Sequence, residues 1–436
     1  MKQMGTSAMQ AKGLTGLGAG SLKFGLLGEQ LSHSFSPLIH AELGNYEYCL
    51  YEKRHEELEV FLKSADFDGL NVTIPYKKSV IPFCKNLSKT ARATGSVNTI
   101  TRLPDGSLYG DNTDCYGFTR LLHKTGINPG DGKILILGSG GSSLTVQTVL
   151  RDMNAKEIVI VSRNGKDNYS NIEEHSDAIL LINTTPVGMY PNNGSSPLPD
   201  IGLFSQCRAV IDLIYNPART ELLLQAEERG ILAVNGLTML AAQAKKAAEI
   251  FTGASIPDNI IETITAKIEQ LTLNITLIGM PGCGKTSMGA ALAKMSGRLF
   301  ADTDALITEA AGKPIPAIFA EDGEEYFRRL ETDTLKELCK QSGLVIATGG
   351  GVVTQPCNRR IMRQNSIIVF LDRDISQLPV SGRPLSQRNG IAALAGERLP
   401  LYSLWSEYTV KVCGIDETVS QIHEMLLKDK NLTNTL

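Results

Sequence analysis

A glycine-rich segment in the middle of the chain has the residue types needed to bind a nucleoside triphosphate. Residues 279–286 read GMPGCGKT and match the phosphate-loop pattern G-x-x-x-x-G-K-[ST]. In such a loop, backbone N–H groups surround the phosphates, the lysine reaches the β and γ oxygens, and the hydroxyl binds Mg²⁺. The pattern therefore predicts a phosphate contact for Lys285 and a metal contact for Thr286. The other predicted nucleotide-binding residues of this loop are Gly282, Cys283, Gly284 and Ser287.

A second glycine-rich loop, LGSGGSS at 137–143, follows an apolar run and could bind a dinucleotide. Taken alone, the loop is equally typical of a structural turn. The next predicted strand ends in Val161-Ser162-Arg163, where an NAD site usually carries an acidic residue. An arginine there could pair with a 2′-phosphate, because a guanidinium matches phosphate oxygens. The pattern favours NADP, with a solvated surface arginine as the alternative.

Alternating strands and helices must position these loops. Order is expected to begin near 23–28. Apolar and β-branched runs predict strands at 68–77, from 133, and at 157–164, 178–186, 208–217, 275–279 and 367–372. Helical patterns occur at 145–153, 220–230, 239–253, 259–271 and 287–295. The alternation predicts an α/β fold with mostly parallel sheets on both sides of a boundary between 253 and 274. We assign no catalytic role to Asp372 at the end of its strand.

Composition narrows the classes of function. The formal net charge of −3 over 436 residues gives no support for nucleic-acid or anionic-membrane binding. Eight cysteines occur singly without a C-x-x-C pair, which argues against a zinc site or a disulfide framework and favours a cytoplasmic location. The sequence has no apolar run of about 18 residues, so no membrane span is predicted. Residues 1–22 are glycine-rich and are expected to form a disordered tail, and the oligomeric state stays open.

Seven short motifs in the first half, in this order, resemble shikimate dehydrogenase. They are SHSFSP (32–37), NVTIPYK (71–77), GSVNT (95–99), GDNTD (110–114), NTTPVGM (183–189), DLIYNP (212–217) and GLTMLAAQA (236–244). The resemblance covers about 23–252 and implies reduction of 3-dehydroshikimate to shikimate with NADPH, in a cleft between a substrate domain and a Rossmann domain. The segment 164–177 is short and polar where this family commonly has a helix.

By this resemblance, Lys77 and Asp114 form the catalytic pair. Hydride arriving at a ketone leaves an alkoxide, which a lysine beside an aspartate can protonate or stabilise. Which of the two transfers the proton stays open. Without the other motifs, Lys77 would be interpreted as a surface lysine and Asp114 as a helix cap. The implied substrate contacts are Ser34 and Ser36 on the carboxylate, with Thr73, Asn98, Tyr215 and Gln243. The implied cofactor contacts are Gly138, Gly140, Gly141 and Ser142 on the pyrophosphate, Arg163 on the 2′-phosphate, and Leu213 and Gly236 near the nicotinamide.

Motifs after the phosphate loop resemble shikimate kinase across about 273–427. They are FADTD (300–304), IFAEDGEEYFRRLE (318–331), ATGGGVV (347–353), GRPL (382–385) and ERLPLY (397–402). The resemblance implies that Asp302 lies beside Mg²⁺ and that Asp304 orients or deprotonates the acceptor hydroxyl. Two arginines suit the carboxylate of shikimate, since each can pair with it through two hydrogen bonds. The implied shikimate contacts are Arg328, Arg398, Gly349, Gly350 and Gly351, and Arg383 is expected at the ATP site.

The two resemblances predict a bifunctional enzyme that makes shikimate and then phosphorylates its 3-hydroxyl. The expected domains are a substrate domain at 23–115 completed by 236–253, an NADP-binding Rossmann domain at 116–235, a linker at 254–272 and a P-loop kinase domain with a parallel sheet at 273–436. Two alternatives stay open. One is a metabolite-sensing regulator built from the same modules, against which the presence of Lys77, Asp114, Lys285 and Asp304 argues. The other is a quinate-using dehydrogenase fused to the kinase.

Overall fold

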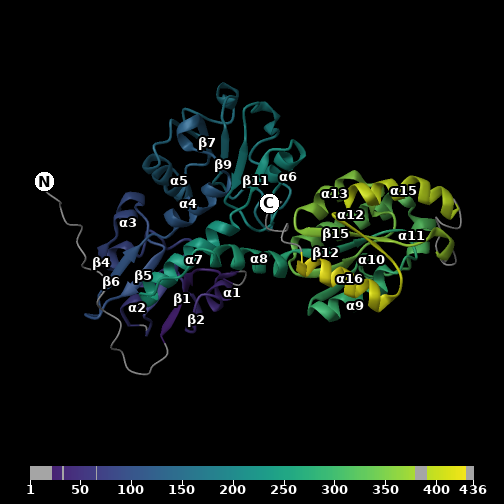
Figure 1. The fold of residues 1–436 in the computed structure, drawn as a ribbon, viewed down its shortest axis with the longest axis horizontal. Coiled ribbons are helices and arrows are strands. Elements are labelled where there is room, and N and C mark those ends of the chain that lie inside the picture. The colour runs from purple at the N-terminus through teal and green to yellow at the C-terminus, as the bar shows by residue number, and fades with distance from the viewer. Residues whose placement is uncertain (1–21, 32–33, 65, 379–389, 429–436) are drawn as a thin grey trace. The chain divides into compact units, whose positions relative to one another are not determined.

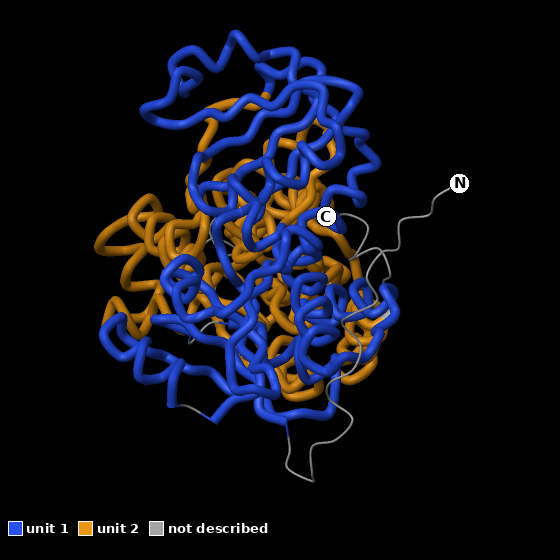
Figure 2. The backbone as a smooth tube through the Cα atoms, turned by 90° about the vertical axis from the view of Figure 1, so that its left-hand side faces the viewer, with its two compact units in different colours: residues 1–185, 202–213, 236–268 blue, residues 186–201, 214–235, 269–436 orange. Residues whose placement is uncertain are grey.

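The computed structural model describes residues 22–31, 34–64, 66–378 and 390–428 (Figure 1). It divides into two compact units (Figure 2). The first comprises 1–185, 202–213 and 236–268, and the second 186–201, 214–235 and 269–436. Residues 1–21 of the predicted tail at 1–22 and the predicted ATP contact Arg383 lie outside the described residues. Within the described ranges, no helix is both long and apolar enough to cross a membrane.

The first unit contains a mixed sheet of strand order β2-β1-β3-β5-β6-β4. Its strands are β1 (Lys23–Gly28), β2 (Glu47–Glu52), β3 (Gly69–Val72), β4 (Cys84–Leu87), β5 (Thr99–Arg102) and β6 (Leu108–Asp111). The pairs β1-β2, β1-β3 and β4-β6 are parallel, as predicted, and only β5 runs antiparallel to both of its neighbours. The reason is the connection between β5 and β6, residues 103–107, which is too short for the crossover that parallel strands need.

Four strands of a second sheet lie in this unit, in the order β10-β9-β7-β8, and their pairs are all parallel. Its strands are β7 (Lys133–Leu137), β8 (Glu157–Val161), β9 (Leu180–Asn183) and β10 (Ala209–Asp212). Strands β9 and β10 are buried along their whole length, as expected for strands covered on both faces. The predicted strands in this region are confirmed. Between β8 and β9 the segment 164–177 forms only the short 3₁₀ helix η4 (Ile172–His175).

Helices of the first unit include two that were predicted from their apolar spacing, α5 and α7. They are α1 (Ser36–Ala41), α2 (Leu58–Ser64), α3 (Lys89–Thr94), α4 (Asp114–Lys124), α5 (Gly141–Asp152) and α7 (Leu237–Thr252). Helix α7 packs against α4 and α1. Near the end of α7, Phe251 stacks on Phe24 of β1 with ring centroids 4.6 Å apart. Helix α7 therefore ties the N-terminal sheet to the later part of the unit. Helix α8 (Ile260–Thr272), also predicted, spans the boundary between the units.

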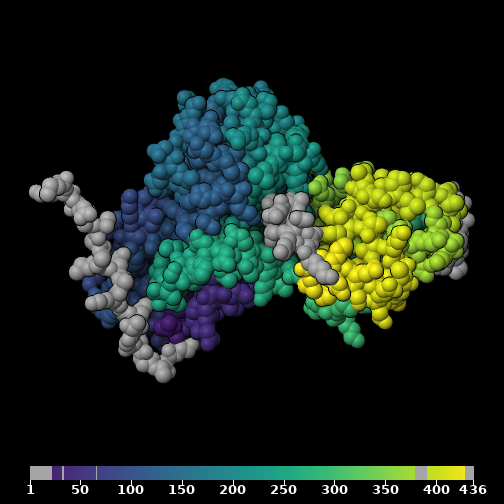
Figure 3. Space-filling view, viewed as in Figure 1, coloured from purple at the N-terminus to yellow at the C-terminus, as the bar shows by residue number. Residues whose placement is uncertain are grey.

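The second unit is built on a fully parallel sheet of order β13-β14-β12-β15-β16. Its strands are β12 (Asn274–Ile278), β13 (Leu299–Asp302), β14 (Leu344–Ala347), β15 (Ser366–Asp372) and β16 (Tyr408–Lys411), with β11 (Leu232–Val234) elsewhere in the unit. Helices cover the sheet on both sides (Figure 1), with α9 packed against α16 and α12 against α13. Figure 3 shows the C-terminal helices, in yellow, on the visible face of this unit.

The helices of the second unit are α6 (Glu221–Glu228), α9 (Lys285–Ser296), α10 (Thr303–Ala311), α11 (Ile315–Glu321), α12 (Glu324–Lys340), α13 (Pro356–Arg363), α15 (Ile391–Trp405) and α16 (Ile415–Lys428). The other 3₁₀ helices of the chain are η1 (His55–Glu57), η2 (Ile81–Phe83), η3 (Pro129–Asp131), η5 (Ile201–Leu203), η6 (Val352–Thr354) and η7 (Ile375–Gln377). Apolar side chains of the sheet and of the helices packed on it form the main core of this unit, and Ile307, Ile318 and Phe327 form a smaller cluster. Strand β12 is buried along its whole length and carries the phosphate loop at its carboxyl end.

A buried ion-pair cluster fixes the segment between α7 and α8. Lys245 of α7 has a side chain only 5% exposed, and its Nζ lies 2.8 Å from both Glu249 Oε1 and Asp258 Oδ1. Burial acts to lower the pKa of Lys245, but the hydrogen bonds to Asp258 and Glu249 outweigh it and raise the pKa above its ordinary value. The start of the connecting segment is thus anchored to α7 by charge.

Lys245→Ala should lower the stability of the first unit by about 3 kcal/mol, because it removes the buried cation of the largely buried Glu249 carboxylate. Its neighbour Lys246 is the matched control. It pairs with the same Glu249 at 3.2 Å but is 42% exposed, so Lys246→Ala should change stability by less than about 1 kcal/mol. Calorimetric unfolding of the two variants and the parent measures the difference. Equal losses in the two variants would show that burial of Lys245 does not set its contribution.

Candidate functional sites

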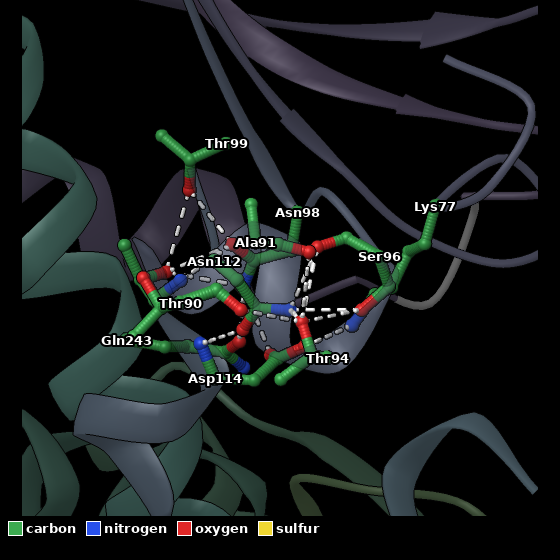
Figure 4. A network of polar contacts seen from close by, with 11 residues as sticks. Lys77, Thr90, Ala91, Thr94, Ser96, Asn98, Thr99, Asn112, Asp114 and Gln243 are labelled. Carbon is green, nitrogen blue, oxygen red and sulfur yellow. Dashed lines mark hydrogen bonds and ion pairs between the residues drawn. The ribbon is translucent and has the colours of Figure 1, made fainter. Parts of the chain in front are cut away.

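The first candidate site is an ion pair between a turn and a helix start. Lys77 lies in the turn that follows β3, and Asp114 is the first residue of α4. The Lys77 Nζ is 2.6 Å from Asp114 Oδ2 (Figure 4). The Asp114 side chain is 8% exposed, whereas that of Lys77 is 30% exposed. The structure therefore brings the two predicted catalytic residues together and leaves the lysine accessible from one side.

Asn98 holds the carboxylate of this pair from the other side. Its Nδ2 donates to Asp114 Oδ1 at 2.9 Å and to Gln243 Oε1 at 3.2 Å. Its Oδ1 accepts from the backbone N–H of Thr113 at 2.8 Å. Both Asp114 oxygens thus accept hydrogen bonds, one from Lys77 and one from Asn98. Two predicted substrate contacts, Asn98 and Gln243, belong to the same network as the predicted catalytic pair.

The side-chain amide of Asn112 also supports this network, and it was not predicted from the sequence. Asn112 Nδ2 donates to Ser96 Oγ at 2.8 Å and to Thr94 Oγ1 at 3.0 Å. Asn112 Oδ1 accepts from the backbone N–H of Asp114 at 3.0 Å. Ser96 and Asn112 stand inside the motifs GSVNT and GDNTD, so those motifs were the available signal. Asn112 links the two turns that carry Asn98 and Asp114.

The remaining predicted substrate contacts lie at the start of α1, at the end of β3 and in the second unit. Ser36 begins α1, and its backbone N–H donates to Ser34 Oγ at 3.2 Å. Thr73 is half-buried at the end of β3, where its N–H donates to Leu27 O at 2.9 Å. Tyr215 belongs to the second unit, and burial raises its pKa. The roles of these residues stay predictions.

The second glycine-rich loop leads from β7 into α5. A Cβ at Gly138 would lie 2.8 Å from Thr184 Oγ1, and Gly138 has a φ of +106°, so this turn requires glycine. A Cβ at Gly140 or Gly141 would meet nothing within 4 Å. Helix α5 begins at Gly141, and its first N–H groups face open space suited to an anion. This donor set fits the pyrophosphate of a dinucleotide.

Two other parts of the predicted cofactor site can be located in this unit. Arg163 is exposed two residues beyond the end of β8, and Ser142 is exposed in the first turn of α5. A Cβ at Gly236 would lie 2.1 Å from the carbonyl oxygen of Leu213, so these two predicted residues touch through backbone that only glycine permits. Their contact with a nicotinamide stays a prediction.

The second candidate site is the phosphate loop between β12 and α9. Gly279, Gly282 and Gly284 have φ of +149°, +83° and +104°, values that favour glycine. Lys285 begins α9, and its buried Nζ donates to Gly279 O at 2.8 Å and to Met280 O at 3.1 Å. The lysine is therefore held across the mouth of the loop, at the positive end of a helix of 12 residues.

Oxygen ligands suited to a divalent cation lie at the start of α9. Thr286 Oγ1 donates to Asp302 Oδ2 at 2.7 Å, and Asp302 Oδ1 caps α10 by accepting from Asp304 N at 2.9 Å. A hydroxyl and a carboxylate beside a phosphate loop match the usual Mg²⁺ site, in which phosphates and water complete the coordination. Thr286 and Asp302 thus fit the predicted metal contacts.

Asp304 is a carboxylate poised at a cavity of about 540 Å³ that also contains Lys285 and Arg328. Its Oδ1 is buried and has no hydrogen-bond partner in the described part of the chain. Burial raises the pKa of Asp304, and the charge of Asp302 adds to the rise, while Lys285 and Arg328 oppose it. An unpartnered oxygen of this kind can accept a proton from a ligand in the cavity.

Two buried arginines line the same cavity. Arg328 Nη1 lies 2.6 Å from Glu331 Oε2, and Arg328 Nη2 lies 3.2 Å from Glu324 Oε1. Arg398 Nη1 donates to Gly350 O at 3.0 Å. The Nε of each arginine is buried without a hydrogen-bond partner among the described residues. Two buried guanidinium groups with spare donors form a cradle for a carboxylate.

The triplet Gly349-Gly350-Gly351 makes room for the side chains around it. A Cβ at Gly349 would lie 2.4 Å from Glu331 Oε1, one at Gly350 would lie 2.6 Å from Pro281 Cγ, and one at Gly351 would lie 2.1 Å from Arg328 Nη1. We predicted that the backbone of these residues holds the substrate. The structure adds that their lack of side chains permits the positions of Arg328 and of the phosphate loop.

Three residues of the cavity region were missed from sequence. Glu331 is fully buried, burial raises its pKa, and it anchors Arg328. Its spacing of three from Arg328 on α12 was the signal that could have found it. Tyr402 donates through its hydroxyl to Gly350 O, four residues after Arg398 on α15. Arg373, just beyond β15, also lines the cavity.

Comparison with known proteins finds matches in both parts of the chain. Residues 26–100 match the family described as the shikimate dehydrogenase substrate binding domain, and residues 281–428 match the family described as shikimate kinase. Over 267 residues the chain is 37% identical to the shikimate dehydrogenase (NADP(+)) of Clostridium perfringens, which covers 56% of this chain and 98% of the relative.

Solved structures resemble the same part of the chain. A chorismate mutase/shikimate 5-dehydrogenase fusion protein from Clostridium acetobutylicum has a TM-score of 0.54 and 36% identity, covering 58% of this chain and 98% of that chain. Shikimate 5-dehydrogenase from Thermus thermophilus, in complex with NADP(H) and shikimate, has a TM-score of 0.51 and 31% identity, covering 56% of this chain and 99% of that chain.

Gly351→Ala should weaken binding of shikimate about tenfold or more, because the added Cβ would displace the guanidinium of Arg328 from its buried ion pair. Gly396→Ala on α15 is the matched control, since a Cβ there meets nothing within 4 Å. The KM for shikimate in the phosphorylation reaction, measured for both variants with ATP and Mg²⁺, gives the comparison. Unchanged shikimate affinity in Gly351→Ala would contradict the assignment of Arg328.

Proposed function

Because the chain belongs to the shikimate dehydrogenase family and carries a shikimate kinase domain, we propose that it catalyses two consecutive reactions. The first reduces 3-dehydroshikimate to shikimate with NADPH. The second transfers the γ-phosphoryl group of ATP to the 3-hydroxyl of shikimate. The observation that carries the proposal is that one chain holds both the Lys77–Asp114 pair and the cavity with Lys285 and Asp304.

We divide the chain into a substrate domain at 23–115 completed by 236–253, a Rossmann domain at 116–235, a linker at 254–272 and a kinase domain at 273–436. The position of the two family matches supports the first and last of these. The fully parallel order β10-β9-β7-β8 supports the second. The eight cysteines are free thiols, which supports a cytoplasmic location, where thiols stay reduced.

In the reduction, Lys77 delivers the proton and Asp114 positions it. Asp114 accepts hydrogen bonds at both oxygens, from Lys77 and Asn98, so its role is to orient the ammonium group. The Lys77 ammonium carries protons and is accessible, so it can donate one to the alkoxide as the carbonyl becomes an alcohol. When bound, NADPH supplies the hydride, and the loop 138–142 with Arg163 would hold it.

In the phosphoryl transfer, the residues of the second unit position the two substrates and balance charge. Arg328 and Arg398 hold the carboxylate of shikimate, and Asp304 accepts the proton of the attacking hydroxyl. The oxygen–hydrogen bond of that hydroxyl breaks, the oxygen bonds to the γ-phosphorus, and ADP leaves. Lys285 neutralises charge on the phosphates. When bound, Mg²⁺ would neutralise charge on the phosphates, and Thr286 with Asp302 would hold it.

The two alternatives to this function are a metabolite-sensing regulator and a quinate-using dehydrogenase fused to the kinase. Nothing in the comparisons supports a metabolite-sensing regulator. For a quinate-using dehydrogenase, the discriminating quantity is the ratio of kcat/KM for oxidation of shikimate and of quinate by the same preparation. We expect that ratio to favour shikimate.

Variants at one site should leave the other reaction intact. Lys77→Ala should reduce kcat of dehydroshikimate reduction at least about 100-fold, the usual loss for a positioned proton donor, with shikimate phosphorylation unchanged. Lys285→Ala should abolish phosphorylation with reduction unchanged. Lys78→Ala is the control for the first variant, because Lys78 is adjacent and exposed. Reduction within a few-fold of the parent in Lys77→Ala would rule out its role as proton donor.

Arg163→Ala should raise KM for NADPH about tenfold and leave KM for NADH nearly unchanged, because only the 2′-phosphate loses a contact. The parent should therefore prefer NADPH and the variant should lose most of that preference. Initial rates with both cofactors measure the effect. An equal rise in both KM values would mean that Arg163 acts on a part that the two cofactors share.

A further inference from the structure

Arg373 lies at the carboxyl end of β15, beside the phosphate loop. Strand β15 pairs with β12 in parallel, with Ile278 opposite Phe370. A Cβ at Gly279, the first residue of the loop, would lie only 2.8 Å from Leu371 O. The loop therefore touches the backbone two residues before Arg373. The side chain of Arg373 lines the same cavity as Lys285 and Thr286.

The guanidinium of Arg373 has an unused donor. Among the described residues, its buried Nε has no hydrogen-bond partner, and no ion pair engages the side chain. The nearby Asp374 is occupied, because its Oδ1 accepts from the backbone N–H and the hydroxyl of Ser376. A buried guanidinium N–H without an acceptor is unfavourable, so its placement at a cavity indicates an acceptor on a bound ligand.

The strand order shows which ligand Arg373 can reach. The order β13-β14-β12-β15-β16 puts the phosphate loop of β12 in the centre. Asp302 and the glycine triplet follow β13 and β14 on one side, and Arg398 donates to Gly350 on that side. Arg373 follows β15 on the opposite side. It therefore faces the nucleotide rather than the acceptor substrate.

We propose that Arg373 binds the phosphate chain of the nucleotide, from the side of the loop opposite the acceptor. The inference rests on the proposed kinase activity of the second unit. A guanidinium suits this position because it presents several N–H donors to phosphate oxygens and stays charged. Arg373 thus acts in nucleotide binding, with Lys285 on the same phosphates from the start of α9.

Binding of ADP with Mg²⁺, measured by calorimetric titration, tests the proposal directly. Arg373→Ala should raise the Kd for ADP and the KM for ATP about tenfold, the loss expected for one charged hydrogen bond. Arg373→Lys keeps the charge but not the fork and should raise both values less, by about threefold. The KM for shikimate should stay within twofold of the parent in both variants.

Arg329→Ala is the matched control, because it removes an exposed arginine of the same domain outside the cavity, and it should leave both values unchanged. Dehydroshikimate reduction by the same preparations reports the integrity of the chain. An ADP Kd within twofold of the parent in Arg373→Ala and Arg373→Lys would overturn the proposal, as would a rise confined to the KM for shikimate. A parent that binds ADP but does not phosphorylate shikimate would instead refute the proposed function.

Discussion

Parallel strands end at one edge of their sheet, and the chemistry of the second unit depends on that constraint. The phosphate loop follows β12, Asp302 ends β13, the glycine triplet follows β14, and Arg373 follows β15. Segments separated by more than 90 residues therefore meet around one cavity. The dinucleotide loop after β7 and Arg163 after β8 follow the same rule in the first unit.

The catalytic pair of the first unit is assembled differently, by hydrogen bonds between turns. Lys77 and Asp114 follow β3 and β6 of a mixed sheet, and the amide of Asn98, just before β5, holds Asp114. The site of the second unit contains more buried charged side chains than the site of the first. Arg328 is neutralised by Glu331, while Asp304 Oδ1 and the Nε of Arg398 have no partner in the described part. Such groups are unfavourable in isolation and favourable once a polar substrate meets them, which is how a site can trade stability for affinity.

Contiguous motifs predicted most of both sites, because loop, strand and helix follow each other directly in the sequence. The phosphate loop, α5, α7, β7 and β12 were all predictable in this way. Strand β2, EYCLYE, was not, because it is mostly exposed and lacks a clear alternation. The antiparallel pairing of β5 and the ion pair of Glu331 also escaped prediction, since pairing and burial depend on distant residues. The glycine triplet shows this limit most clearly, because the clashes that an added Cβ would make with Arg328 and Pro281 depend on the three-dimensional fold.

The central claim is that a single chain both reduces and phosphorylates the same carbon skeleton. The direct measurement is mass spectrometry of the product formed by the purified chain from 3-dehydroshikimate, ATP, Mg²⁺ and NADPH deuterated at both C4 positions of the nicotinamide. We predict shikimate 3-phosphate that carries one deuterium, and the same compound without deuterium when unlabelled NADPH is used. Deuterated shikimate without a phosphate, or no deuterated product, would contradict the account.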